Sequence, residues 1–171
     1  FDSQACRSLR TNFCEKIVYE TDVRDFDFTR LKGIDLVAGG PPCQPFSNGG
    51  KHKANDDLRD MFPSAVRAVE VLKPKAFLFE NVKGLLRTSF SEYFQYILMQ
   101  LQFPNSTLGK KEDPYKHFYR LKKINPQTFT GTQYRVSYKL LNADDYGITQ
   151  IRQRVFIVGL RNDLSGNWQF P

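Results

Sequence analysis

The chain has 171 residues, 40% of them hydrophobic and 14% aromatic, which excludes a disordered or collagen-like protein and fits one compact domain. Lys and Arg outnumber Asp and Glu by 25 to 18, and the net charge of +7 fits a polyanionic partner such as nucleic acid, although many proteins without such a partner are as basic. No apolar run approaches the roughly 20 residues of a membrane-spanning helix, so no membrane association is expected.

Short apolar segments alternate with helical periods from the start of the chain, which indicates an α/β fold. Asp2 or Ser3 can cap a first helix. The expected inward face of this helix consists of three apolar residues, Cys6, Leu9 and Phe13. Two strands are predicted next, a short one at 17–19 and a buried one at 34–38.

Two more helices and a strand are predicted in the middle of the chain. The first helix begins at about Phe62 and stops before Pro74, and a strand follows at 76–79. A capping box at 89–92 predicts the start of the other helix, which has one apolar side.

The last two predicted strands, 134–141 and 154–160, are expected to be antiparallel neighbours across a turn near Gly147. Ahead of them, an insert at about 104–133 has no clear period but combines positive charge with aromatic residues. Its central residues are Lys110, Lys111, Tyr115, Lys116, Phe118, Tyr119, Arg120, Lys122 and Lys123. The insert is either a nucleic-acid surface or a solvated loop anchored by its aromatic side chains.

Cys43 follows the strand predicted at 34–38, inside the proline-rich stretch 41–45 (PPCQP). Loops at the carboxyl ends of strands commonly hold the ligand in open α/β sheets. With three cysteines, no Cys-x-x-Cys pair and two histidines, the chain has no zinc spacing, and we expect a reducing compartment with at least one free thiol. The position of Cys43 favours a nucleophilic thiolate over a structural thiol.

Glu80 ends the next predicted strand, and parallel strands would bring it to the same sheet edge as Cys43. It could cap the following turn, or, in a dry pocket where its pKa would rise, donate a proton at neutral pH. Gln150, Arg152 and Arg154 would share one side of an extended backbone. On that side, a bound anion or Glu80 could neutralise the two guanidinium groups. The alternative is that these residues form an exposed basic hairpin without a binding role.

At these residues the chain resembles the cytosine-C5 DNA methyltransferase family, whose members use S-adenosylmethionine. The match runs in order through PPCQPFS at 41–47, ENV at 80–82 and QIRQR at 150–154, with looser matches at 57–59 and 142–147. The resemblance implies a Rossmann-like S-adenosylmethionine-dependent methyltransferase fold, α/β with a mixed sheet.

In the mechanism of this family, the thiolate matching Cys43 attacks C6 of a cytosine flipped out of double-stranded DNA, and C5 then accepts the methyl group. The resemblance implies that Glu80 hydrogen-bonds N3 and the exocyclic amine, and that Arg154 contacts the cytosine carbonyl oxygen and Glu80. It also implies four residues that support the catalytic loop and contact nearby phosphates: Gln44, Ser47, Gln150 and Arg152. Arg152 is counted with the catalytic residues as well.

For S-adenosylmethionine, which becomes S-adenosylhomocysteine, the resemblance implies that Phe1 packs on the adenine, Asp22 meets its amine beside Val23, and Pro42 lines the methionine side. No metal is implied. The glycine-rich first motif and the target-recognition domain of the family have no counterpart in residues 1–171, so a partial catalytic domain, incomplete at its N-terminus, is expected. The missing N-terminal segment is expected on a longer precursor or on a partner chain, because an orphan strand and an open sheet edge would otherwise result.

The resemblance therefore predicts a DNA (cytosine-5-)-methyltransferase of a bacterial restriction-modification system, located in the cytoplasm at the nucleoid. Two alternatives stay open: a relative that methylates cytosine in tRNA, and a non-catalytic nucleic-acid-binding fragment. The intact Cys43, Glu80 and Arg154 argue against the second, because a scaffold needs no thiol at that position.

Overall fold

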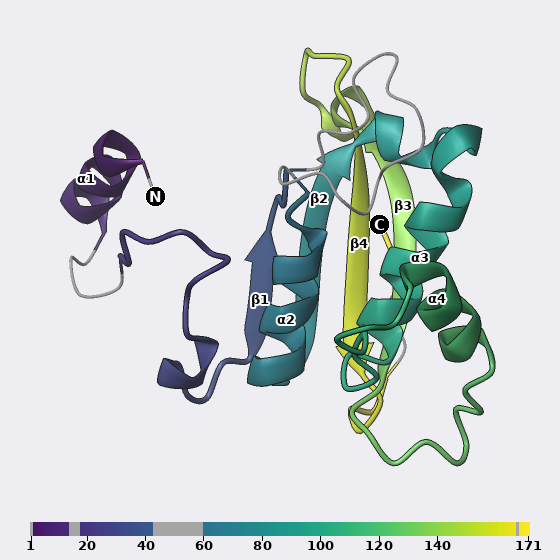
Figure 1. The fold of residues 1–171 in the computed structure, drawn as a ribbon. Helices are drawn as coiled ribbons and strands as arrows, with labels where there is room; N and C mark the ends of the chain where they lie inside the picture. Colours follow the sequence, from purple (N-terminus) through teal and green to yellow (C-terminus); the bar gives the residue numbers. More distant parts are fainter. Residues whose placement is uncertain (1, 14–17, 43–59, 167) are drawn as a thin grey trace.

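The computed structural model describes residues 2–13, 18–42, 60–166 and 168–171 (Figure 1). Within them, one mixed sheet has the strand order β1-β2-β4-β3. Its strands are β1 (Leu36–Gly39), β2 (Ala76–Val82), β3 (Tyr134–Asn142) and β4 (Gln153–Arg161). β1 and β2 are parallel, whereas β4 runs antiparallel to β2 and β3. The predicted α/β class and the antiparallel pairing of the last two strands are confirmed.

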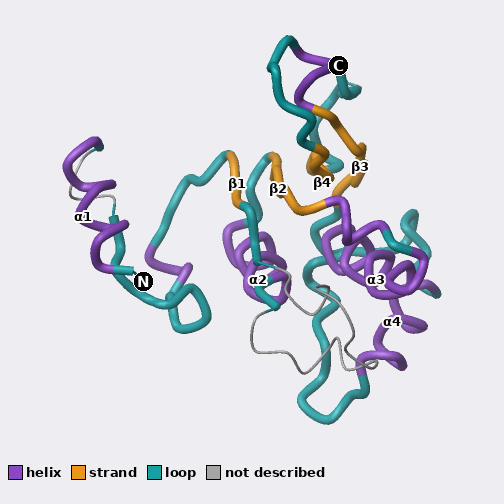
Figure 2. The backbone as a smooth tube through the Cα atoms, turned by 90° about the horizontal axis from the view of Figure 1, so that it is seen from above, coloured by secondary structure: helices purple, strands orange, loops and turns teal. Residues whose placement is uncertain are grey.

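Helices cover one face of this sheet. They are α2 (Phe62–Leu72), α3 (Ser91–Gln102) and α4 (Pro114–Lys122), and α1 (Ser3–Asn12) precedes them in the chain. Seen from above in Figure 2, α2 and α3 lie on the same side of the sheet and α4 lies outside α3. Among the described residues, no helix combines the length and the apolar composition needed to cross a membrane.

The core forms where alternate residues of β2 and β4 face the helices. Phe77 and Phe79 of β2 pair with Gly159 and Ile157 of β4, and all four are buried. The intervening β2 residues point to the opposite face, because side chains alternate along a strand. Glu80 is one of these, so the strand that builds the core also presents this carboxylate on the other face of the sheet.

Gly159 lies directly against the ring of Phe77. A Cβ added to Gly159 would lie 2.1 Å from Cζ of Phe77, closer than any real carbon contact. Since Phe77 is 0% exposed, its ring has no space into which to move. We expect Gly159→Ala to lower the free energy of unfolding by about 1–3 kcal/mol, measured by urea denaturation. Gly39→Ala in β1 is the control, because its Cβ would meet no described atom within 4 Å; equal losses in both variants would contradict the prediction.

The N-terminal part of the chain differs from the prediction. Asp2 caps α1 as expected, and Cys6 is 7% exposed, but Leu9 and Phe13 are 46% and 65% exposed, so the predicted inward face is wrong at both. Figure 1 shows the reason: α1 stands apart from the sheet and from the other described helices. The strand predicted at 17–19 is also wrong for its described residues, since they pair with no described strand.

The segment after position 18 is held by aromatic and cationic contacts instead. Tyr19 packs edge-on against Phe26, and Phe26 against Phe28, with ring centroids 5.0 and 5.2 Å apart. Arg67 of α2 lies over the Phe28 ring and donates to the carbonyls of Val23 and Phe26 at 2.7 and 3.1 Å. These contacts fasten the segment to α2 without any strand pairing.

The predicted helices in the middle of the chain are confirmed, but one cap is not. α2 begins at Phe62 and ends before Pro74. The predicted capping box is wrong: α3 begins at Ser91, and its N-cap residue is Phe90, whose side chain cannot cap the helix. A short 3-10 turn at Thr88–Phe90 occupies the position where the capping serine was expected, so Ser89 lies inside that turn.

The insert is more regular than predicted, because it contains α4. Asp113 accepts the N–H groups of Tyr115 and Lys116, and Pro114 occupies the first turn, where its missing N–H costs nothing. Phe118 is 3% exposed and packs with three other buried side chains, Tyr96, Phe103 and Leu121. The apolar positions of α4 are few and are surrounded by charges, which hid its period in the sequence.

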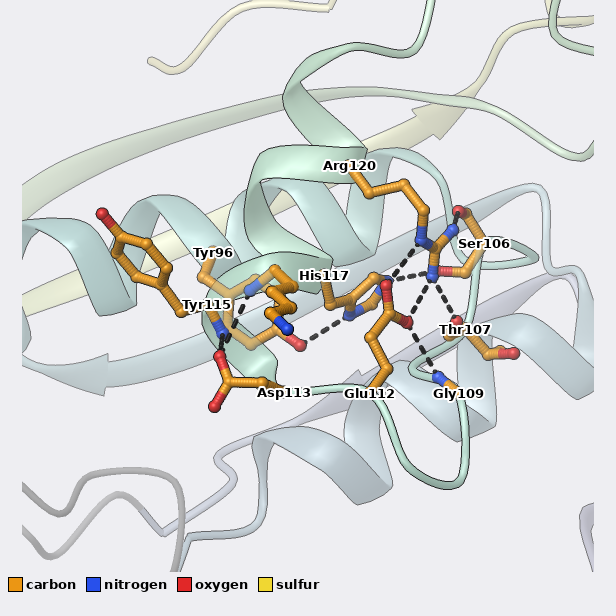
Figure 3. Close-up of polar contacts among 10 residues, drawn as sticks. Tyr96, Ser106, Thr107, Gly109, Glu112, Asp113, Tyr115, His117 and Arg120 are labelled. Atoms are coloured by element: carbon orange, nitrogen blue, oxygen red, sulfur yellow. Dashed lines mark hydrogen bonds and ion pairs between the residues drawn. The ribbon is translucent and has the colours of Figure 1, made fainter.

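His117 of α4 is fully buried in a polar contact shown in Figure 3. Its Nε2 lies 2.7 Å from the carbonyl of Ser106, which can only accept, so Nε2 carries the proton. Nδ1 is then the acceptor for the hydroxyl of Tyr96, 2.6 Å away. Burial lowers the pKa of His117 and raises that of Tyr96 to about 12, so neutral forms of both side chains are stable here.

This contact predicts a loss of stability in mild acid. The pKa of His117 is lower in the folded state than the unfolded value of about 6.5, so the unfolded state binds the proton first, and stability falls as the pH drops below 6.5. We expect His117→Gln, compared with the unmodified chain in urea denaturation at pH 7.5 and 5.5, to show a smaller acid-induced loss. An identical loss in both proteins would contradict this assignment.

Candidate active site

The chain leaving β1 lies beside the end of β2. A Cβ built on Gly40 would lie 3.4 Å from Oε2 of Glu80. The side-chain amide of Asn81 donates to the carbonyl of Pro41 at 2.9 Å, and its oxygen accepts the N–H of Val82 at 2.8 Å. Because Asn81 is 5% exposed, its amide needs these partners, and the bonds hold Pro41 beside the end of β2.

Pro42 is fixed from the other direction. Its carbonyl accepts the N–H of Met61, the residue before α2, at 3.0 Å. The next residue back, Asp60, accepts the hydroxyl of Tyr93 from α3. Pro42 and Met61 flank positions 43–60, so both ends of this segment are bound to each other beside β2. The base of the loop that carries the predicted nucleophile is therefore placed at the sheet edge.

Glu80 forms an ion pair with Arg154, with 2.8 Å between Oε1 and Nε. The register pairs Val82 with Arg154 and Glu80 with Phe156, which makes Glu80 and Arg154 diagonal neighbours on one face of the sheet. The predicted contact between these two residues is confirmed. Their side chains are 37% and 24% exposed, so the described residues alone do not form the dry pocket considered for Glu80.

Gln150 and Arg152 do not continue this strand. β4 begins at residue 153, and Gln150 lies in a bend, so the extended backbone predicted to align Gln150 with Arg154 is wrong. The cause is a turn: Oδ1 of Asn142 accepts the N–H of Arg152 at 3.0 Å and holds the chain at the end of β3. Arg152 still lies opposite the end of β3, where its carbonyl accepts the N–H of Ala143 at 3.1 Å. The side chains of Gln150 and Arg152 are exposed beside this end of the sheet.

Only some of the residues predicted to bind a cofactor lie in the described part of the chain, and they do not form a complete site. Both oxygens of Asp22 accept hydrogen bonds from Arg24, which lowers the pKa of Asp22 to about 2 and keeps it ionised. Val23 is tied to α2 through its carbonyl, and Pro42 lies past the end of β1. An ionised carboxylate fits the amine of an adenine, but Arg24 already occupies this one. The described residues thus fit the adenine end of the cofactor in part.

Four predicted site residues, Phe1, Cys43, Gln44 and Ser47, lie outside the described residues. Their positions relative to Glu80 stay predictions.

Sequence reasoning missed the roles of Asn81 and Arg67. Asn81 falls on the core face of β2 by strand alternation, and a buried amide requires partners, so this signal was available. Arg67 lies beside the apolar stripe of α2, but its carbonyl partners lie 41 and 44 residues away in the chain, and no local pattern predicts them.

The profile of the family described as C-5 cytosine-specific DNA methylase matches residues 1–105 and 114–170. Among curated relatives, the Type II methyltransferase M.NgoMIV of Neisseria gonorrhoeae is 37% identical over 99% of this chain and 46% of its own length. The Type II methyltransferase M.AquIA of Picosynechococcus is 36% identical over 99% of this chain and 63% of its own length. The chain thus spans about half the length of these relatives.

Solved structures share the fold. A DNMT2 variant from Spodoptera frugiperda aligns over 99% of this chain and 42% of its own, with a TM-score of 0.60 and 20% identity. The Dnmt2 methyltransferase of S. pombe aligns over 98% of this chain and 43% of its own, with a TM-score of 0.56 and 17% identity. At these identities the likeness concerns the architecture, which is the Rossmann-like methyltransferase fold expected from the motifs.

Proposed function

This chain belongs to the C-5 cytosine-specific DNA methylase family, and from that premise we propose that its protein transfers a methyl group to C5 of cytosine in double-stranded DNA. One observation carries the proposal: the Glu80–Arg154 ion pair lies beside the fixed base of the loop that contains Cys43. A carboxylate oriented by a guanidinium can bind a pyrimidine by its edge, and we propose that the Cys43 thiol, in the segment that leaves this base, attacks the ring.

We propose that the thiolate of Cys43 adds to C6 of a cytosine flipped out of the duplex, which breaks the aromaticity of the ring and makes C5 nucleophilic. Glu80 hydrogen-bonds N3 and the exocyclic amine, where charge develops, and Arg154 orients Glu80 and contacts the carbonyl oxygen. C5 then forms its bond to the methyl group, a base removes the C5 proton, and the electrons of that C–H bond restore the ring as the Cys43 sulfur leaves.

The family implies S-adenosylmethionine, whose sulfonium supplies an electrophilic methyl group. We propose that Asp22 accepts from the adenine amine, beside Val23, that Phe1 packs on the adenine, and that Pro42 lines the methionine side. This role requires Arg24 to release one oxygen of Asp22, because it now bonds to both.

We further propose that a strand outside these 171 residues, on the same precursor or on a partner chain, pairs with β1. The side of β1 away from β2 has no described partner, and Leu36 on this edge strand is 54% exposed. Parallel strands are normally covered on both faces, and natural edge strands are usually protected, so an exposed apolar residue on this edge fits a further strand beside β1. Slower amide exchange at 36–39 in the full-length protein than in the 171-residue piece would support this pairing, and equal exchange would contradict it.

The similarity to two enzymes named Type II methyltransferases supports a role in a bacterial restriction-modification system, in the cytoplasm at the nucleoid. In this role, four residues contact DNA phosphates and support the loop that contains Cys43: Gln44, Ser47, Gln150 and Arg152.

The test is transfer of a tritiated methyl group by the full-length protein to duplex DNA and, in parallel, to tRNA. Incorporation into duplex DNA supports the proposal. Incorporation into tRNA alone would assign the protein to a tRNA methyltransferase instead. A non-catalytic protein would give neither product and no covalent adduct with duplex DNA that contains 5-fluorocytosine, a base from which the C5 substituent cannot leave as a proton.

A further inference from the structure

The outer face of α4 is basic and carries two tyrosines. His117, Phe118 and Leu121 point into the protein and are at most 3% exposed. The remaining side is exposed, with Tyr115 at 59% and Tyr119 at 39%. We call the α4 surface the set of exposed residues Tyr115, Lys116, Tyr119, Lys122 and Lys123. Figures 1 and 2 show α4 outside α3, on the side away from the sheet, so this surface is separate from the Glu80 site.

The acids of this segment are used within the protein. Glu112 accepts two hydrogen bonds from Arg120 at 2.8 Å, which lower the pKa of Glu112 to about 2, and Asp113 caps α4 (Figure 3). Lys116 and Lys123 form no ion pair with any described residue, and Lys122 lies over the ring of Phe118 with its ammonium 4.1 Å from the ring centre. Lys116 and Lys123 therefore face solvent without an ion-pair partner among the described residues, although the Glu92 carboxylate of α3 acts electrostatically on Tyr115.

The two tyrosines of the α4 surface also provide a hydrogen-bond donor that can reach a ligand. Their rings are 4.6 Å apart, and the hydroxyl of Tyr115 donates to the hydroxyl oxygen of Tyr119 at 3.0 Å. The proton of Tyr119 is therefore available to an acceptor outside the protein. Ammonium groups together with a phenolic donor are the groups that proteins use to bind the sugar-phosphate backbone of nucleic acids.

We propose that the α4 surface binds the phosphate backbone of duplex DNA, as a sequence-independent contact outside the catalytic site. The choice of duplex DNA as partner rests on the proposed function, while the contact itself needs only phosphates. α4 has nine residues and is about 13 Å long, which is long enough to reach more than one phosphate of a DNA strand. Lysines and a tyrosine hydroxyl along that length match a row of phosphates better than a single anion.

The test is the salt dependence of binding to a poly(dA)·poly(dT) duplex, which contains no cytosine and so does not need the catalytic site. In the full-length protein, Lys116→Gln/Lys123→Gln removes two charges from the α4 surface. Lys32→Gln/Lys73→Gln removes two exposed lysines elsewhere and is the matched control. We expect the first pair to reduce the slope of log K against log salt by about 2, and affinity at 0.1 M salt by roughly tenfold or more, with little change in the control.

A second variant tests the tyrosine donor. Tyr119→Phe keeps the ring and the charge, so we expect affinity to fall by about twofold to fivefold with an unchanged salt slope. Equal slopes for the α4 pair and the control pair would overturn the proposal, as would a slope difference seen with tRNA but not with the duplex. Methyl transfer to a cytosine-containing duplex is measured separately. If no methyl group is transferred but the difference in salt slope is still observed, the proposed function is overturned while the proposed DNA contact of the α4 surface is supported.

Discussion

Cys43→Ser is expected to reduce methyl transfer by a factor on the order of 10³ or more while DNA binding is retained. A hydroxyl is far less acidic than a thiol, so almost no anion is present at neutral pH to attack C6. The side chain changes by one atom, and the lysines and arginines that would contact phosphates are untouched. Tritium incorporation measures the turnover, and a gel-shift titration with duplex DNA measures the binding.

Cys14→Ser is the control for this prediction, because Cys14 lies outside the motifs that resemble the methyltransferase family. It should retain turnover and should still form a denaturation-resistant adduct with 5-fluorocytosine DNA, whereas Cys43→Ser should form none. Substantial turnover in the Cys43 variant, or an adduct that survives the substitution, would show that another group attacks the base.

The arrangement around Glu80 could be predicted because it follows from local rules. An apolar segment ending in glycines predicted β1, and the parallel pairing of β1 with β2 placed the chain near Cys43 beside Glu80. The predicted burial of this strand is wrong among the described residues: β1 is an edge strand there, and Leu36 is 54% exposed. The antiparallel return of β4 then set Arg154 diagonally opposite Glu80. Each of these predictions depended only on the alternation of residues along a strand or on the position where a strand ends, and both can be recognised in the sequence.

The incorrect predictions concern segments whose structure depends on distant partners. An apolar run at 17–19 has the composition of a strand, but a strand exists only with a neighbour, and no described strand pairs with it. α4 was missed because much of its stability comes from burial against α3 and from the cap at Asp113, while its exposed positions are almost all charged or tyrosine. Local composition alone does not carry that information.

Glu80→Gln is expected to lower kcat by a factor on the order of 10² or more and to leave the fold intact. The glutamine side chain has nearly the same shape, but it cannot carry the negative charge that pairs with Arg154, and it cannot hold or release a proton at N3 of the cytosine. Because both side chains of the ion pair are partly exposed, its loss should cost less than about 1 kcal/mol in the free energy of unfolding. Single-turnover methyl transfer and urea denaturation measure the two effects separately.

Two controls decide whether the carboxylate acts on the base or merely caps a turn. Glu92→Gln removes an exposed carboxylate from the first turn of α3 and should leave the rate unchanged. Arg154→Gln should itself be slow, and combining it with Glu80→Gln should cost much less than the product of the two single effects, since both variants disable the same ion pair. A Glu80→Gln enzyme with the rate of the unmodified protein would reduce Glu80 to a structural residue, and the thiolate would then have to work without this stabilisation of the cytosine ring.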